Sequence, residues 1–264
     1  MLKILIFSWF LLLPISYAKE KALSLAVFPY SSPAKILQHN KGLKYFLQNE
    51  LQQPISIVTA KSNKDYVHKL KEGAYDFIFA APHIARYAEL HANYKRVAVT
   101  KNKIQAYYII KKSSSFKSLA DLKNKTIAMT SEYAIFHQLA LHDFEKHKIF
   151  KGKNLKVNIM KNNLNSIFAL LKNKADVALT GILLWKKLPD KYKRDLKLLE
   201  KSTKTTGFII MVKKSLAPQL QKITKNSLLK FHTSKEGKSY LFKGYREITD
   251  SEMKQLDPYI YVFK

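Results

Sequence analysis

The chain has 264 residues, of which 47% are hydrophobic, so it can fold as one large or two modest domains, and disorder is excluded for most of its length. It carries a net charge of +28 and contains no cysteine, which excludes disulfides and a lipid anchor on an N-terminal cysteine. The cations are nearly all lysine and are spread along the chain, whereas arginine dominates the reading of base edges. The charge therefore favours a solvated basic surface over a nucleic-acid-binding stripe, and we expect no nucleic-acid partner.

The first 18 residues have the pattern of a secretory signal peptide. Lys3 supplies a positive start, residues 4–13 an apolar stretch, and Ser16 and Ala18 the small residues of a cleavage site. The apolar stretch is shorter than the roughly 20 residues of a spanning helix, so an uncleaved membrane anchor is the less favoured alternative. We expect cleavage after Ala18 and a mature protein in a bacterial periplasm, which suits a secreted chain without disulfides.

Helix and strand patterns alternate along the remaining sequence. Short apolar runs bounded by turn residues predict strands at 24–28, 55–60, 76–80, 96–100, 106–111, 126–130, 155–160, 176–180, 196–199 and 207–212. Amphipathic segments predict helices at 33–50 with Ser32 as its cap, 64–72, 83–91 and 133–146, a helix capped by Asn165 or Ser166 that ends near 173, and two helices between 218 and 242. Such alternation predicts an α/β protein with parallel sheets.

Two segments about a hundred residues apart repeat one pattern. Residues 67–82 and 168–181 each contain a helix end, a basic turn, an aspartate, an apolar run and small residues. Ligands of open α/β sheets bind beyond the carboxyl ends of the strands, so Pro82 and Thr180, which stand at or just after such ends, mark a candidate site. Two units predict two lobes around a shared cleft: residues 19–104 with 213–264, and residues 105–212. The strands at 106–111 and 207–212 are expected to be the crossovers between them.

The sequence lacks the common motifs of catalysis and nucleotide binding, namely G-x-S-x-G, the Walker loop, G-x-G-x-x-G and a cysteine nucleophile. His137, His142 and His147 are five residues apart, which scatters them around a helix and predicts solvent-facing side chains rather than a metal site. Asp76 and Asp176 stand at strand starts, away from the predicted site, where aspartate stabilises turns. We therefore expect no enzyme activity, no cofactor and no bound metal.

The segment Thr130-Ser131-Glu132-Tyr133 is a candidate anion site because it joins the end of a strand to the start of a helix. Backbone N–H groups and the positive end of the helix dipole favour an anion there, and Thr130 and Ser131 add hydroxyl groups. The alternative is that these hydroxyls only cap the helix. Glu132 would repel an anion if it pointed inward, but could pair with a cationic part of a zwitterionic ligand.

Aromatic residues are the expected walls of the cleft. Tyr107 and Tyr108 lie in a predicted crossover strand, where alternation directs one of the two inward. Tyr30 and His83 follow strand ends directly. Packing in the core is the alternative for these side chains.

Four segments match a known family in content and order: VFPYSSP, LKEGAYDFIFAAPHIARYAE, AYYIIKKSSSFKSLADLKNKTIAM and LKNKADVALT. With them, the whole mature chain resembles the phosphate-, phosphite- and phosphonate-binding proteins of ABC transporters. The resemblance implies the type II periplasmic binding-protein fold, in which two α/β lobes are joined by two crossover strands with a ligand cleft between them. It also implies a monomer that closes over a small, anionic, phosphonate- or phosphate-like ligand and docks on a membrane permease or on a sensor protein.

The sequence departs from the family in two places. A Ser-Thr-Ser-Gly loop is typical of the family, whereas residues 130–134 here contain no glycine. A family histidine thirteen residues before the later aspartate is replaced by Asn163, so Asn163 or Asn165 is the expected amide donor. An enzyme on the same fold, and a basic protein that binds nucleic acid or anionic lipid, remain as alternatives.

Overall fold

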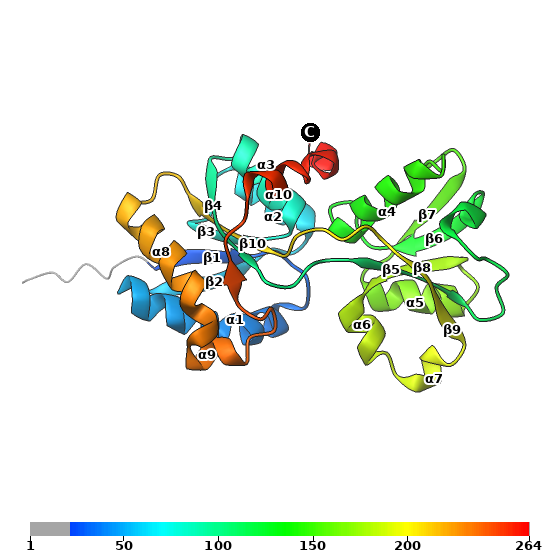
Figure 1. Cartoon of the computed structure of the whole chain (residues 1–264), viewed down its shortest axis with the longest axis horizontal. Coiled ribbons are helices and arrows are strands. Elements are labelled where there is room, and N and C mark those ends of the chain that lie inside the picture. The colour runs from blue at the N-terminus through cyan, green and yellow to red at the C-terminus, as the bar shows by residue number, and fades with distance from the viewer. Residues whose placement is uncertain (1–21, 264) are drawn as a thin grey trace, which may run out of the picture.

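The computed structural model describes residues 22–263 as two α/β lobes that lie side by side (Figure 1). The expected signal peptide, residues 1–18, and its cleavage site after Ala18 lie outside the described residues. In residues 22–263, no helix is long and apolar enough to cross a membrane. The predicted α/β class with two lobes is confirmed.

Lobe 1 is built on a six-stranded sheet in the order β11-β4-β10-β3-β1-β2, in which β10 runs antiparallel to both of its neighbours. Helices α1, α8 and α9 cover one face of this sheet and α2 and α3 the other (Figure 1). The elements are β1 (Leu23–Val27), α1 (Pro33–Leu51), β2 (Ile55–Thr59), α2 (Asn63–Lys71), β3 (Phe77–Ala80), α3 (Pro82–His91), β4 (Tyr94–Thr100), β10 (Ile209–Lys213), α8 (Pro218–Lys230), α9 (Lys235–Lys238), β11 (Tyr245–Arg246) and α10 (Asp250–Lys254), with short 3-10 helices at Phe231–Thr233, Asp257–Tyr259 and Tyr261–Phe263.

Lobe 2 is built on a five-stranded sheet in the order β7-β6-β8-β5-β9. Helix α4 covers one face and α5 and α6 the other, so that each face of the sheet has its own apolar core (Figure 1). The elements are β5 (Ala106–Lys111), β6 (Lys125–Met129), α4 (Ile135–Lys146), β7 (Leu155–Ile159), α5 (Asn163–Leu171), β8 (Val177–Gly181), α6 (Ile182–Lys187), α7 (Asp190–Lys193) and β9 (Leu196–Lys201), with a 3-10 helix at Leu119–Leu122.

The same aspartate contact fixes the start of a central strand in each lobe. The Asp76 carboxylate accepts hydrogen bonds of 2.8 Å from the backbone N–H and the hydroxyl of Ser24, at the start of the neighbouring β1. The Asp176 carboxylate accepts a hydrogen bond of 2.8 Å from the backbone N–H of Thr126, in the neighbouring β6. The structural role predicted for the two aspartates is thus confirmed, and each aspartate ties two parallel strands together at the end opposite the cleft.

The lobes are joined by two chain segments, residues 101–105 and 202–208. These segments are bonded to each other: the backbone N–H of Ile104 donates to Thr205 O over 3.1 Å, and the N–H of Thr205 donates back to Ile104 O over 2.9 Å. Beside this pair, the N–H of Ala106 donates to the Ser202 hydroxyl over 2.8 Å. The connection between the lobes is therefore a short two-stranded ribbon.

The second connecting segment needs a glycine where it enters lobe 1. A Cβ atom on Gly207 would lie 2.3 Å from Thr100 Oγ1 and 2.4 Å from Asn102 O, which is closer than van der Waals contact permits. The two connecting segments can approach this closely only because residue 207 has no side chain.

The structure corrects the predicted crossovers. Residues 106–111 were expected to cross between the lobes, but they form β5 inside the second sheet. Residues 207–212 were likewise expected to cross, but β10 pairs with β3 and β4, so residues 209–212 belong to lobe 1. Periodicity identifies such apolar runs as strands, but it does not say which sheet they join.

The helix starts are predicted more closely than the short elements. Ser32 stands at the N-cap position of α1 as expected, but α5 is capped by Asn162 rather than Asn165 or Ser166: the Asn162 side chain accepts from the N–H of Asn165 over 2.9 Å. The short elements α6, α7, α10 and β11 carry too few residues for a periodic pattern, and the sequence did not predict them.

Replacing Asp76 or Asp176 with alanine should lower the free energy of unfolding by about 1–3 kcal/mol, because each change leaves a backbone N–H without its acceptor. Denaturant unfolding monitored by circular dichroism measures the change. Asp195→Ala is the matched control, because the Asp195 side chain is 65% exposed and makes only a surface ion pair. Equal stability of all three variants would contradict the role of Asp76 and Asp176 in tying neighbouring strands together.

Candidate functional site

The carboxyl ends of the central strands of both lobes lie next to the connecting ribbon. In lobe 1, Ala80 at the end of β3 pairs with Ile209 at the start of β10, which comes directly from the ribbon. In lobe 2, Gly181 at the end of β8 pairs with Ala106 at the start of β5, which also follows the ribbon. The loops that follow β3 and β8 therefore face the opposite lobe, and with them the loops after the parallel strands β1 and β6.

The 130–134 loop is shaped by its own hydrogen bonds. The Ser131 hydroxyl accepts from the N–H of Tyr133 over 3.2 Å, and Ser131 O accepts from the N–H of Ala134 over 2.9 Å. Thr130 O lies 2.9 Å from His137 Nδ1. The Glu132 carboxylate lies 3.6 Å from Lys151 Nζ, so its charge is offset by a surface lysine. The loop thus presents a helix N-terminus and the Thr130 and Ser131 side chains, both half-buried, at the carboxyl edge of lobe 2.

His137 lies beneath this loop and is completely buried, which corrects the expectation that it faces solvent. Its Nδ1 carries the proton toward Thr130 O, and its Nε2 has no partner. Burial lowers the pKa of His137, so its ring is a neutral support for the loop. His142 packs against Tyr259, and His147 is exposed. Within residues 22–263, no group of three or more histidine and carboxylate side chains could hold a metal ion.

A second helix N-terminus at this edge has two unpartnered hydroxyls beside it. Ser166, in the first turn of α5, and Thr180, near the end of β8, are completely buried, and neither hydroxyl has a hydrogen-bond partner. Thr180 pairs with Tyr107 across the sheet, so both side chains point to the face on which Tyr107 packs against α5. The half-buried Asn163 and Asn165 stand in the same turn. Hydroxyls, amides and helix N–H groups of this kind suit an anion.

Tyr107 and Tyr108 lie in the two cores of lobe 2, which corrects their prediction as walls of the cleft. Tyr108 is completely buried against α4, and its hydroxyl donates to Asp143 Oδ2 over 3.1 Å. Tyr107 is 7% exposed and packs on the α5 side. As strand alternation predicts, the two rings lie on opposite faces of the sheet. Both rings are buried, because helices cover both faces.

In lobe 1, Tyr30 lies at the carboxyl edge as predicted. Its hydroxyl lies 3.3 Å from His39 Nδ1 and accepts from Asn40 Nδ2 over 3.3 Å. Burial raises the pKa of Tyr30 to about 12, so the phenol stays protonated. Its ring belongs to an aromatic cluster with Phe28, Phe208 and Phe242.

His83 forms a direct hydrogen bond between the lobes. Pro82 begins α3, and His83 follows it, completely buried, with its Nε2 3.1 Å from Tyr133 O of the 130–134 loop. The carbonyl accepts, so Nε2 carries the proton and Nδ1, which has no partner, is bare. Burial lowers the pKa of His83 to about 3. Two residues predicted separately for the site are thus brought into contact across the lobes.

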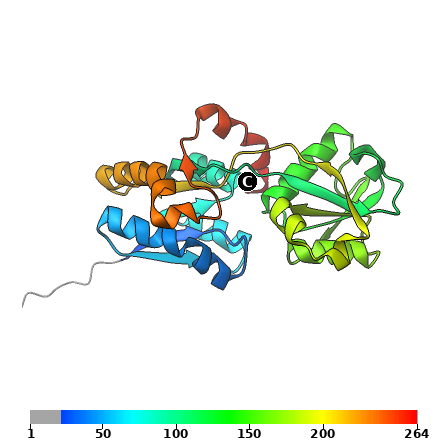
Figure 2. The ribbon, with the colours of Figure 1, turned by 60° about the horizontal axis from the view of Figure 1, so that its bottom comes forward.

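The C-terminal segment, residues 257–263, is a part of this region that sequence analysis missed. It lies between the lobes beside α3 and α4 (Figure 2). The Phe263 ring lies 5.2 Å from that of His83 in lobe 1 and 5.8 Å from that of Tyr133 in lobe 2. Ile135 and Leu139 of α4 join the same apolar core. The run of aromatic and aliphatic residues at 259–263 was the available signal for a buried terminus.

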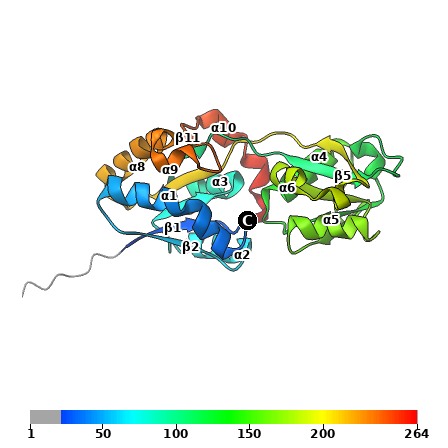
Figure 3. The same ribbon diagram turned by 90° about the horizontal axis from the view of Figure 1, so that it is seen from below.

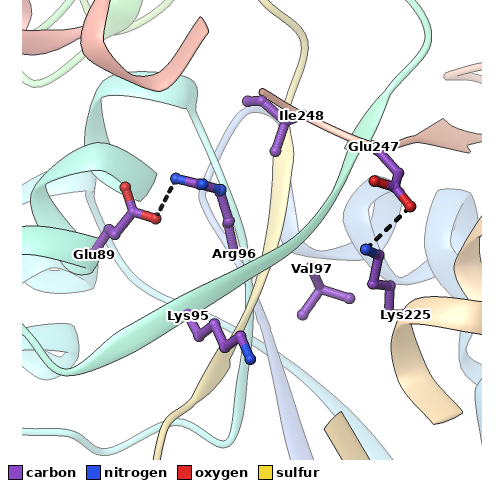
Figure 4. Close-up of a pocket in the computed structure, with 7 residues that line it drawn as sticks. All are labelled: Glu89, Lys95, Arg96, Val97, Lys225, Glu247 and Ile248. Carbon is purple, nitrogen blue, oxygen red and sulfur yellow. Dashed lines mark hydrogen bonds and ion pairs between the residues drawn. The ribbon is translucent and has the colours of Figure 1, made fainter. Parts of the chain in front are cut away.

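A separate hollow of about 480 Å³ lies on the outer surface of lobe 1, away from the strand ends (Figure 4). Four of its five charged side chains are paired: Arg96 with Glu89 over 2.8 Å, and Lys225 with Glu247 over 3.0 Å. Arg96 also pairs with Asp250. The members of each pair neutralise each other's charges, whereas Lys95, which also lines the hollow, has no ion pair within residues 22–263.

The two sheets and the cleft-facing strand ends define a two-lobed binding protein of the type II periplasmic fold. The sequence profile of the family described as ABC transporter, phosphonate, periplasmic substrate-binding protein matches residues 25–253, and the chain belongs to this family. Members of the family bind small-molecule ligands in the periplasm and work with the permeases of ABC transporters; they are not enzymes. No curated protein sequence matches the chain.

Solved structures show the same fold at low sequence identity. PhnD1 from Prochlorococcus marinus, in complex with methylphosphonate, has a TM-score of 0.79 and 14% identity, covering 90% of this chain and 97% of that one. A binding protein of a phosphonate ABC transporter from Pseudomonas aeruginosa has a TM-score of 0.75 and 15% identity, covering 90% and 86%. XAC2383 from Xanthomonas citri, bound to ATP, has a TM-score of 0.77 and 15% identity, covering 90% and 95%.

The His83 contact should make stability depend on pH. The buried ring stays neutral down to a pKa of about 3, while the unfolded chain takes up a proton below about pH 6.5. This contribution is therefore complete above about pH 6.5 and is lost as the pH falls toward 3, by up to about 1.4 kcal/mol per pH unit. In His83→Gln, the amide can still donate to Tyr133 O but does not titrate. Urea unfolding from pH 7 to pH 4 should show the wild type losing more stability than the variant; parallel curves would contradict the assignment.

Replacing Phe263 with alanine should lower the stability of the protein and increase local opening in both lobes, because the Phe263 ring contacts both. Truncating a buried phenylalanine costs about 3–5 kcal/mol, and amide hydrogen exchange should rise in the first turn of α3 and in the 130–134 loop. Tyr261→Ala, whose side chain is 69% exposed, should have a much smaller effect on both readouts. Faster exchange confined to lobe 1 would show that Phe263 supports only its own lobe.

Proposed function

We propose that this protein binds a small phosphonate- or phosphate-like anion by closing its two lobes, and delivers it unchanged to the membrane permease of an ABC transporter. It acts as a monomer in the periplasm after removal of its signal peptide. Contacts from both lobes favour the closed form, because a ligand shifts an equilibrium only by its differential affinity for the two states.

The pair of buried hydroxyls of Ser166 and Thr180 carries this proposal. A buried hydroxyl without a partner is costly, and two of them beside the N-terminus of α5 find a common explanation in an acceptor that arrives from outside. The Thr130 and Ser131 side chains at the N-terminus of α4 add a second group of donors at the same edge. Helix N-termini with hydroxyl groups bind oxyanions without requiring a positive side chain.

The ligands of proteins with a similar fold support the proposal that the ligand of this protein is an anion. PhnD1 is in complex with methylphosphonate, and XAC2383 was solved with chloride and with ATP. The ligands of these proteins differ widely in size but share negative charge. The surplus of lysine on this chain gives a positive field that would help an anion to arrive.

Thermal-shift measurements with inorganic phosphate and methylphosphonate test the proposal. A ligand at 100 times its dissociation constant stabilises the folded protein by about 2.7 kcal/mol, which is readily detected. Thr180→Val should weaken binding at least about tenfold, because one hydrogen bond to a charged group is worth about 1.5–3 kcal/mol. The same variant should keep or gain stability without ligand, because valine fills the space and leaves no unpaired hydroxyl.

Ser113→Ala is the control, since Ser113 is an exposed hydroxyl outside the cleft. No shift with any anion would overturn the proposal. Unchanged affinity in Thr180→Val would remove Thr180 from the site while leaving the rest of the proposal in place.

A further inference from the structure

One wall of the cleft is aromatic. The rings of Phe28 and Phe208 lie 5.0 Å apart, and those of Tyr30 and Phe208 lie 6.3 Å apart and nearly parallel, at 21°. Phe28 is 7% exposed, whereas Tyr30 and Phe208 are half-buried. Tyr30 follows the end of β1 and Phe208 precedes the start of β10, so both partly open rings lie at the carboxyl edge of lobe 1.

The opposite lobe presents two large apolar side chains at its own carboxyl edge. Ile182 and Leu183 follow β8 directly and are 38% and 52% exposed. The other side of this short helix is used for packing, because Trp185 and Leu188 belong to the core with Tyr107. Helix α6 lies on the side of lobe 2 nearest lobe 1 (Figure 3). The exposed apolar pair is therefore not an incomplete core but a surface beside the cleft.

The strand ends place these two walls at the edges where the lobes meet. Phe208, stacked with Tyr30, directly precedes β10 in lobe 1, and Ile182 and Leu183 directly follow β8, whose end pairs with the start of β5 in lobe 2. The pKa of His39 is lowered mainly by burial, then by the charge of Lys35 on its own helix and by that of Lys187 at the end of α6. The His39 ring stacks on Tyr30, with centroids 6.2 Å apart and an angle of 11°. Leu183 is four residues before Lys187, on the same side of α6. The exposed pair on α6 and the Tyr30–Phe208 wall therefore lie at the two edges that border the connecting ribbon.

The loops at this edge contain few charges. Residues 28–32, 80–83, 130–134, 160–163, 180–183 and 206–208 include one lysine, Lys161, and one acid, Glu132, which pairs with Lys151. They contain no arginine. Such a set can hold one small anionic head by hydroxyls and N–H groups. It also presents the half-buried rings of Tyr30 and Phe208 and the exposed side chains of Ile182 and Leu183.

We propose that the ligand is an organic oxyanion whose apolar group is larger than methyl, and that this group lies between Tyr30 and Phe208 on one side and Ile182 and Leu183 on the other. This inference rests on the proposed function and adds the chemical class of the ligand. The anionic head binds at the helix N-termini, and closure of the lobes removes the apolar group and both walls from water. Burial of apolar surface then contributes to affinity where charge does not.

Isothermal titration calorimetry of the full mature chain tests this inference with inorganic phosphate, methylphosphonate, phenylphosphonate and hexylphosphonate. Phenylphosphonate and hexylphosphonate should bind at least tenfold more tightly than methylphosphonate, and phosphate should bind most weakly. In Leu183→Ser, the ratio of the phenylphosphonate affinity to the methylphosphonate affinity should fall at least fivefold. Leu90→Ser is the matched control, because Leu90 is similarly exposed, at 47%, on α3 and away from the cleft; it should leave the ratio unchanged.

The outcomes separate the two proposals. Tight binding of phosphate or methylphosphonate with weaker binding of the larger phosphonates would overturn the apolar subsite and leave the proposed function intact. No binding of any of the four would overturn both. A fall in the ratio that is equal in Leu183→Ser and Leu90→Ser would overturn the placement of the apolar group on α6.

Discussion

The antiparallel pairing of Ile104 with Thr205 is the constraint on which the arrangement of the molecule depends. Because the two connecting segments are bonded to each other, both lobes meet at one short ribbon rather than at two independent linkers. The central strands β3 and β8 end beside this ribbon. The helix N-termini that follow strand ends in the two lobes are therefore directed at the same gap between the lobes.

The fold was largely predictable because its signals are local. Short apolar runs with turn residues at both ends identified the long strands, and Gly73, with a φ of +67°, follows the C-cap of α2 in the left-handed conformation that glycine favours there. The assignment of strands to sheets was less predictable. Strands β5 and β10 are apolar on both faces, and the residue pattern of such a strand does not indicate which sheet it joins. Only tertiary packing decides that question.

The site was predicted in outline but not in detail. The sequence identified the carboxyl edges of the two sheets as candidate binding edges, and Tyr30, His83 and the 130–134 loop are all found there. Tyr107, Tyr108 and His137 instead became core residues, because helices on both sides of the second sheet leave no open face. Local pattern also gave no information on contacts between distant segments, such as the position of Phe263 between His83 and Tyr133.

The packing of the C-terminal segment against α4 has a consequence for how the lobes can move. A two-stranded ribbon by itself permits bending and also twisting of one rigid body against another. The segment at 257–263 adds a point of contact off the line of the ribbon, through Tyr259 with His142 and Phe263 with Tyr133. Twisting would shear these rings past each other, whereas rotation about an axis through the ribbon and the rings would keep them packed. The contacts of the tail therefore oppose twisting of the lobes more than rotation about that axis.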